Sequence, residues 1–517
     1  MKKIATLLLA AGLVFGAATG ASAIDFKAKG QWIMSFDYGQ NGGFTGGNGV
    51  TGFNATNRGR NQGEDEFEAK QRIRLQLDAV ASEALSGTVF FEMGDTTWGN
   101  NNSGGALGAD GRIVEVKNAY IDWIVPQTDL KIRMGIQGIA LPSFTTGSNV
   151  FADDVAGITA SYQFNENVGM TALWARPYND NYVNANDHGG NRTNYMDNVD
   201  MFALLVPLTF DGVKVTPWVS YAAIGPNAFR NSNNNYFGNF VGASSVYPAA
   251  GMVALGGARH KDGTASTKAM GTYGNAVWAG LTGEVTAFDP FRFAWDFNYG
   301  SVSYADSRAN RAGWLGSLLA EYKLDWATPG LYGWYASGDD GNPSNGSERL
   351  PSLSTSSTDN GFSDFAFSGG KGLSRESLVS YDMSGTWGIG VRLKDMSFIE
   401  NLKHTVRLNV FGGTNSTTMT RYLANHNAAY TTFTTVGPNA GIVGSGPLYM
   451  TTNDTAMEIG MSNEYKMYDN FSVFLDASYI SLWLDKSRSV WGNSRMNGRS
   501  DQERDPWDVN VRFVYSF

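Results

Sequence analysis

The sequence predicts an all-β fold, a transmembrane antiparallel β-barrel of about 18 strands. Three observations carry this prediction. Many segments alternate apolar and polar residues, short turns alternate with long polar loops, and no apolar run of 18 or more residues follows the N-terminal segment. A helix that crosses a membrane needs roughly 20 apolar residues. Strands are therefore the elements that could cross a membrane here.

The N-terminus carries the pattern of a secretory signal peptide. Lys2 and Lys3 precede an apolar run at 4–15, and small residues follow up to Ala23. A basic start, a short apolar stretch and an A-x-A site are the three parts of such a signal. We predict cleavage between Ala23 and Ile24, because the apolar run is too short to span a bilayer.

Cleavage at this point divides the chain into two parts, a signal peptide at 1–23 and a single transmembrane barrel domain at 24–517. No Pro-rich linker and no shift in composition separates the second part into smaller domains. A single large barrel accounts for a length that exceeds one ordinary soluble domain.

Alternation begins with the first predicted strand, at 26–38, and continues in the second, at 67–78. One face of each strand is apolar and the other is polar or charged, which is the period of a strand. Charges on so many strands fit a wet lumen with lipid on the opposite side. The candidate pore-lining bases are Lys70, Arg72 and Arg74 on the second predicted strand and Lys131 and Arg133 on the fifth.

The last predicted strand, at 507–517, alternates up to the final residue. An aromatic strand with a free edge invites aggregation in water. Pairing that edge to close a barrel removes the problem, and lipid accommodates the apolar outer face. The residues of this apolar face are Trp507, Val509, Val511, Phe513, Tyr515 and Phe517.

The connections distinguish a membrane barrel from a soluble sandwich, which shows the same period. Short turns on the periplasmic rim and long loops on the extracellular rim are typical of outer-membrane barrels. Counting strands gives about 18, with 16 as the alternative, and either number leaves an aqueous channel. Short turns lie at 165–167, 210–212, 289–290 and 469–470, and long Gly/Asn/Ser-rich loops lie at 39–63, 94–111, 176–198, 223–274, 338–381, 412–454 and 484–505.

Composition excludes several classes of function. The chain has no cysteine, so a lipid-anchored cysteine, disulfides and thiol catalysis are excluded. A formal net charge of -9 makes it a poor binder of nucleic acid. Enzymatic barrels need a nucleophile with a base, but the four histidines show no metal-ligand spacing, and we predict no enzyme. These histidines are His188, His260, His404 and His426.

We predict no cofactor and no resident metal site. The acidic run Asp339-Asp340-Gly341-Asn342 lies in a predicted extracellular loop and is the one candidate for a divalent cation shared with lipopolysaccharide. Most acidic loop clusters are simply solvated, and that reading stands beside the first.

The C-terminal strand resembles the terminal strand of bacterial outer-membrane barrels. An aromatic Phe517, preceded by Phe513 and Tyr515 at alternate positions, carries this resemblance. The segments 116–123 and 133–137 look like the porin pattern that precedes the third extracellular loop. The whole chain is similar to Gram-negative general porins, and closest to the homotrimeric outer-membrane porin family of sulfate-reducing bacteria.

The resemblance implies an outer-membrane porin, a water-filled channel for passive diffusion of small hydrophilic solutes and ions. It also implies a homotrimer, and a C-terminus read by the barrel assembly machinery. In such porins the third extracellular loop folds into the lumen. Its counterpart here is 138–154, with Asp153 and Asp154 as constriction acids, although the Pro-Glu-Phe-Gly tip of many porins is missing.

Other interpretations remain open. The basic residues could line the constriction, or could be solvated charges elsewhere in the lumen or at a subunit contact. A substrate-specific sugar or anion channel would carry aromatic residues along the lumen, and Trp278 and Trp334 are candidates. A structural or adhesive barrel, in contact with outer-membrane lipid and lipopolysaccharide, would not conduct.

Overall fold

The structure is a computed structural model that describes residues 24–40, 66–100, 104–108, 114–179, 198–225, 251–254, 272–353, 361–367, 371–374, 383–419, 449–485 and 505–517. These residues form 19 strand segments in one antiparallel sheet. The segments are β1 (Asp25–Gln40), β2 (Glu66–Ser82), β3 (Leu85–Thr97), β4 (Glu115–Ile124), β5 (Lys131–Ala140), β6 (Ala152–Gln163), β7 (Gly169–Asn179), β8 (Asn198–Leu205), β9 (Leu208–Phe210), β10 (Val213–Ile224), β11 (Gly274–Val285), β12 (Phe291–Ser303), β13 (Arg311–Tyr322), β14 (Thr328–Ala336), β15 (Thr386–Ile399), β16 (Leu402–Gly413), β17 (Thr455–Tyr468), β18 (Phe471–Trp483) and β19 (Trp507–Ser516).

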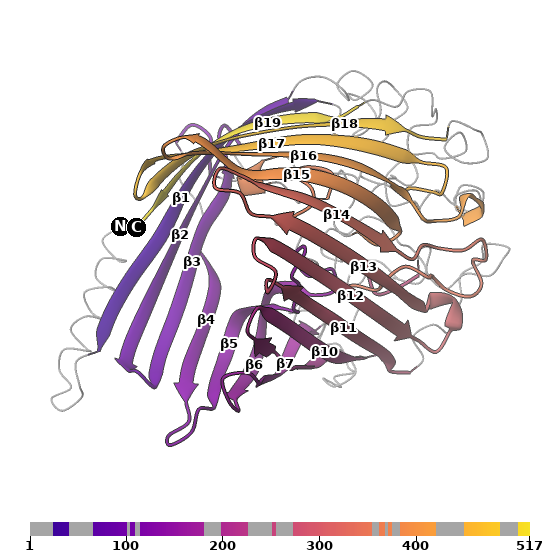
Figure 1. Cartoon of the computed structure of the whole chain (residues 1–517). Coiled ribbons are helices and arrows are strands. Elements are labelled where there is room, and N and C mark those ends of the chain that lie inside the picture. Colours follow the sequence, from indigo (N-terminus) through magenta and orange to yellow (C-terminus); the bar gives the residue numbers. More distant parts are fainter. Residues whose placement is uncertain are drawn as a thin grey trace.

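The sheet closes on itself, because β1 pairs with β2 on one edge and with β19 on the other (Figure 1). β8 and β9 both pair with β10 and are two pieces of one strand, interrupted near Pro207. The described residues therefore form a closed barrel of 18 strands, and the predicted fold class is confirmed. Two short 3₁₀ helices, η5 (Ser307–Ala309) and η6 (Lys371–Leu373), lie in connections.

The outer face of the barrel wall is apolar, and polar and charged residues of the same strands point inward. In β12, Phe293 and Phe297 are exposed, whereas the intervening Asp296 is only 2% exposed. In β19, Asp508 and Asn510 are 6% and 0% exposed, whereas the apolar residues that alternate with them along the strand are partly exposed. A soluble protein shows the opposite arrangement, because water and not lipid then surrounds its outer face.

The two rims differ in the length of their connections. Two-residue turns join β2 to β3 at 83–84 and β17 to β18 at 469–470. The connection from β12 to β13 lies at the opposite end of the barrel. We call the end that carries 83–84 and 469–470 the short-turn rim, and the other end the long-loop rim. Among the described residues, no helix is long and apolar enough to cross a membrane.

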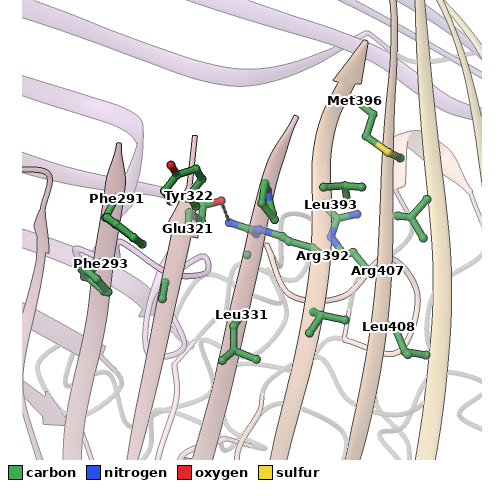
Figure 2. A pocket seen from close by; sticks show the side chains of 15 residues that line it. Phe291, Phe293, Glu321, Tyr322, Leu331, Arg392, Leu393, Met396, Arg407 and Leu408 are labelled. Atoms are coloured by element: carbon green, nitrogen blue, oxygen red, sulfur yellow. Dashed lines mark hydrogen bonds and ion pairs between the residues drawn. The ribbon is translucent and has the colours of Figure 1, made fainter. Parts of the chain in front are cut away.

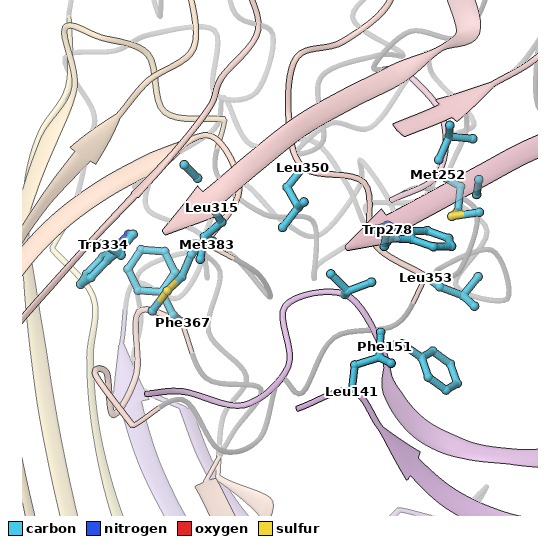
Figure 3. Packing of buried hydrophobic residues seen from close by; sticks show 14 of the residues in the cluster. Leu141, Phe151, Met252, Trp278, Leu315, Trp334, Leu350, Leu353, Phe367 and Met383 are labelled. Carbon is cyan, nitrogen blue, oxygen red and sulfur yellow. The ribbon is translucent and has the colours of Figure 1, made fainter. Parts of the chain in front are cut away.

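An apolar core lies inside the barrel, towards the long-loop rim. Segments 141–151, 350–353 and 361–367 pack against inward side chains of β10–β17 (Figure 3). Trp278 and Trp334 of the wall are 0% and 4% exposed beneath these segments. The lumen predicted as wet is therefore partly dry on this side, because the loops bring their own apolar side chains into it.

The seam of the barrel is formed by a close contact between β1 and the C-terminus. The backbone of Gly30 exchanges two hydrogen bonds with that of Phe517, at 2.8 and 3.0 Å. The aromatic ring of Phe517 also covers Gly30, where a Cβ atom would lie 2.5 Å from the ring and 2.6 Å from the carbonyl oxygen of Arg74. A glycine is required here because both neighbours approach so closely.

We expect Gly30→Val to impair barrel closure, with a cost of about 1–3 kcal/mol from overpacking. The fraction of protein that refolds to the heat-modifiable form on unboiled denaturing gels measures the effect. Gly87→Val in β3 is the matched control, because nothing lies within 4 Å of the Cβ position there. Equal folding yields for the two variants would contradict this account of the seam.

Candidate functional site

The segment 141–151, between β5 and β6, leaves the wall and reaches β12 and β13. Asp296 of β12 accepts hydrogen bonds from the backbone N–H groups of Phe144 and Thr145, at 2.8 and 3.0 Å, and from the hydroxyl of Ser143 at 2.6 Å. The hydroxyls of Thr145 and Ser317 lie 2.7 Å apart. We call this segment the first pore loop. It lies within the predicted loop 138–154, whose two ends belong to β5 and β6.

A second inward segment, 361–367, is held by Glu458 of β17 in the same manner. One carboxylate oxygen accepts the backbone N–H groups of Asp364, Phe365 and Ala366, at 3.1, 2.7 and 3.2 Å. Ser363 donates its hydroxyl to the same carboxylate, at 2.8 Å to the other oxygen. We call 361–367 the second pore loop. No local sequence pattern distinguishes Asp296 or Glu458, the two anchors of the pore loops, because each is one inward polar residue among many.

A bridge of three charged side chains connects the wall beneath the two pore loops. Glu321 of β13 accepts hydrogen bonds from Arg292 and Arg392 at 2.8 and 2.6 Å. Arg292 also donates to the carbonyl of Phe144 at 3.0 Å, and Arg392 to the carbonyl of Gly361 at 2.6 Å. Both pore loops are thus tied to one buried carboxylate.

The bridge crosses β14 at Gly330. A Cβ atom there would lie 3.2 Å from the side chain of Glu321 and 3.3 Å from that of Arg392. Figure 2 shows Arg392 reaching across this strand to Glu321. Glycine at this position leaves the space that the ion pair needs.

The predicted pore-lining bases lie on β2 and β5, and four of the five pair with a carboxylate on the same strand or on a neighbouring strand. Arg72 pairs with Asp95 at 2.5 and 2.6 Å. The other pairs are Lys70 with Glu68 at 2.5 Å, Arg74 with Glu92 at 2.6 Å and Arg133 with Asp122 at 2.7 and 2.9 Å. Lys131 is exposed at the start of β5.

We call Arg72, Arg74, Glu92, Asp95, Asp122 and Arg133 the charged strip. Its side chains remain partly accessible, from 19% for Glu92 to 52% for Asp95. The guanidinium of Arg133 also lies 4.1 Å from the ring centre of Tyr120. The three arginines and three carboxylates of the charged strip therefore cancel in formal charge, whereas the sequence alone suggested a run of positive charge.

The predicted constriction acids, Asp153 and Asp154, are residues of β6 and lie at the foot of the first pore loop. Asp154 pairs with Lys117 and accepts a hydrogen bond from Asn118 at 2.7 Å. The carboxylate that contacts the loop tip is Asp296 of β12. A role for Asp153 and Asp154 in the constriction stays a proposal.

The two candidate lumen aromatics point inward and are covered. Trp278 donates its indole N–H to the carbonyl of Pro351 at 2.9 Å, and Trp334 donates to the hydroxyl of Thr386 at 3.0 Å. Both rings also lie over glycines of neighbouring strands, Gly300 and Gly388. They therefore stabilise the packing of the loops and do not form an exposed aromatic path.

The carboxylates of the acidic run at 339–342 accept hydrogen bonds from residues of the long-loop rim. Asp339 accepts hydrogen bonds from Ser347 and, at 2.8 Å, from Tyr449. Asp340 accepts the backbone N–H of Asn342 at 2.6 Å. Burial raises the pKa of nearby Glu348, and the charges of Asp340 and Asp339 raise it further. In the described ranges, no group of three or more His, Cys, Asp or Glu side chains is arranged to bind a metal.

Of the four histidines, the structure describes His404, which lies in β16 and contacts Asn463 at 2.5 Å. The other three, at 188, 260 and 426, fall outside the described residues.

A groove of about 700 Å³ lies on the wall between β12 and β16 (Figure 2). The side chains of Phe291, Phe293, Leu331 and Leu408 line it, and all four are exposed. They alternate with inward residues such as Arg292 and Tyr332, so the groove belongs to the outer face. It is not part of a passage through the lumen.

Comparison with known proteins gives a fold likeness only. No family model matches the chain, and no curated protein matches it. Among solved structures, Pseudomonas aeruginosa OpdK with vanillate is 10% identical with a TM-score of 0.47, over 95% of this chain and 98% of that one. Acinetobacter baumannii OccAB3 is 9% identical with a TM-score of 0.47, over 95% and 100%. Pseudomonas aeruginosa OpdQ is 10% identical with a TM-score of 0.46, over 95% and 98%.

At these identities and TM-scores the likeness assigns no family and no substrate to this chain. The specific family of sulfate-reducing bacteria suggested by the sequence is not confirmed. What the fold defines directly is a closed 18-stranded barrel with two loops held inside its lumen.

We expect Glu321→Gln to lower the free energy of unfolding by roughly 3 kcal/mol, because it leaves two arginines without their shared buried partner. Thermal or denaturant unfolding in detergent measures this change. Glu464→Gln on β17 is the control, since Glu464 contacts Ser472 and neither arginine. A loss no larger than that of the control would show that the bridge contributes little to stability.

Proposed function

We propose that the protein is an outer-membrane channel through which small hydrophilic solutes and ions diffuse passively. The observation that carries this proposal is the inverted wall, with apolar side chains outside and charged side chains inside a closed barrel. Lipid accommodates such an outer face, and an 18-stranded barrel is wide enough for an aqueous passage. The predicted signal peptide at 1–23 supports export to the outer membrane.

The narrowed lumen favours a solute-selective channel over a wide general porin. Two pore loops and their apolar packing occupy the side of the lumen next to β10–β17. The partly accessible charged strip on β2–β5 supplies polar groups for solutes on the other side. Selectivity in a channel follows from its narrowest diameter and from the charges that line it.

The chemistry of the strip suggests which solutes pass. Each guanidinium has a carboxylate beside it, so the local field changes sign over a few ångströms. Such a field orients dipolar solutes and does not strongly exclude either ion. Polar and zwitterionic solutes of small size therefore fit this passage better than apolar ones.

Assembly is part of the same proposal. We propose a homotrimer in contact with outer-membrane lipid and lipopolysaccharide, inserted by the barrel assembly machinery through Phe513, Tyr515 and Phe517. No enzymatic activity is proposed.

Purified mature protein in a planar bilayer should give discrete conductance steps. A trimer of channels would close in thirds, and block by one particular sugar or anion would identify a solute-specific channel. Heat denaturation of the same sample is the control, since it should abolish the steps. Absence of steps from protein shown to be folded would contradict the channel and favour a structural or adhesive barrel.

The double variant Arg72→Gln with Arg74→Gln should be more selective for cations than wild type. The reversal potential in a salt gradient should shift accordingly. The reason is that Asp95 and Glu92 would then lose their positive partners. Lys323→Gln, in the exposed short turn after β13, is the control for removing a positive charge elsewhere. An unchanged reversal potential would remove the two arginines from the passage.

A further inference from the structure

We infer that Asp296 and Glu458 are positioning residues that hold the two pore loops in the lumen while ionised and release them when protonated. This inference rests on the proposed channel function and names the residues that set the width of the channel. It predicts a passage that is narrow near neutral pH and wider in acid.

The contacts around both carboxylates are those of ionised groups. Glu458 is 1% exposed and accepts three backbone N–H groups, the hydroxyl of Ser363 and the amide of Asn409, the last at 3.0 Å. Asp296 accepts two backbone N–H groups and the hydroxyls of Ser143 and Thr145. An ionised carboxylate is purely an acceptor, so it satisfies such a set of donors.

Protonation changes this balance. A carboxylic acid carries one O–H donor, which cannot face an N–H group without losing a hydrogen bond. Hydrogen bonds to a charged group are also about twice as strong as neutral ones. The amides of the pore loops therefore hold their anchors less tightly in acid. Loop amides left without an acceptor would then form more favourable hydrogen bonds with water than with the protonated side chain.

Near Asp296, few charged side chains could oppose its protonation or take the place of the loop donors. Its direct partners on the adjoining strands are Thr282 of β11 and Ser317 of β13, which carry no charge. Arg292 on its own strand is engaged by Glu284 and Glu321. Among the described residues, no lysine, arginine or histidine forms an ion pair with Asp296, so its charge is balanced by loop amides and hydroxyls.

At Glu458 two further charged side chains of opposite sign lie close by, Asp364 and Arg407. Its partners on the adjoining strands are Asn409 of β16 and Ile480 of β18. Asp364 of the second pore loop lies close by and pairs with Arg407. Because Arg407 offsets the charge of Asp364, the backbone N–H groups of the second pore loop are the main donors to the charge of Glu458.

The two loops are placed to respond together. A Cβ atom on Gly361 of the second pore loop would lie 2.9 Å from the carbonyl oxygen of Thr145 in the first. The bridge through Glu321 also touches both loops, as described above. Release of one loop therefore removes support from the other, and the change in width should be cooperative.

The first test is hydrogen exchange at fixed pH 7, which does not depend on conductance. Asp296→Asn should speed exchange of the amides of Phe144 and Thr145, and Glu458→Gln should speed exchange at 364–366. Glu464→Gln, on the same strand as Glu458, should leave both loops unchanged. Exchange in the two variants equal to wild type would overturn the inference.

The second test measures conductance at pH 7 and at a series of lower pH values. Wild type should conduct more in acid, while the Asp296→Asn and Glu458→Gln variants should already show the larger conductance at pH 7. A wild-type profile that is flat, or that the variants share, would overturn the inference. Faster loop exchange without any conductance in wild type would instead overturn the channel function alone.

A reversible lock separates loop release from other effects of acid. The hydroxyls of Thr145 and Ser317 are 2.7 Å apart, and the chain has no cysteine, so Thr145→Cys with Ser317→Cys offers one defined disulfide. Oxidised protein should lose the rise in conductance in acid, and reductant should restore it. An acid response that persists with the disulfide formed would show that the first pore loop does not move.

Discussion

Pairing of the last strand with the first is the constraint on which the rest of this structure depends. A sheet in lipid must leave no unpaired backbone N–H or C=O group, so only a closed barrel is stable there. The β1–β19 pairing closes this one, and Phe517 folds its ring against Gly30 at the seam. Once the wall is closed, alternate residues necessarily face the lumen, and their chemistry is available for function.

The lumen depends on a second kind of contact, between wall carboxylates and loop amides. Loops that enter a barrel carry backbone donors away from water, and these donors need partners. Asp296 supplies an acceptor from β12 and Glu458 supplies one from β17. Apolar side chains such as Phe362 and Phe367, both 0% exposed, then fill the space between loop and wall. The loops are thus packed elements of the fold.

Much of the fold could be predicted, because period-two alternation and loop length are local properties. The first and last strands, the inward faces of β2 and β5, and the inward direction of Trp278 and Trp334 follow from alternation alone. The candidate site was harder. Arg72 was recognisable as inward, but its partner Asp95 lies on the next strand, and pairing across strands depends on register. The sequence therefore suggested a run of positive charge, whereas the structure pairs these arginines with carboxylates of neighbouring strands.

The sequence by itself determined the class of barrel and the face on which strand residues lie, and it limited the number of strands to about 18 or 16, since these follow from short-range periodicity. Only the tertiary structure decided which loops enter the lumen and what holds them. Asp296 and Thr145 are 151 residues apart in the sequence, and Glu458 and Asp364 are 94 residues apart. No local pattern marks such pairs, because barrel closure and strand register bring them together.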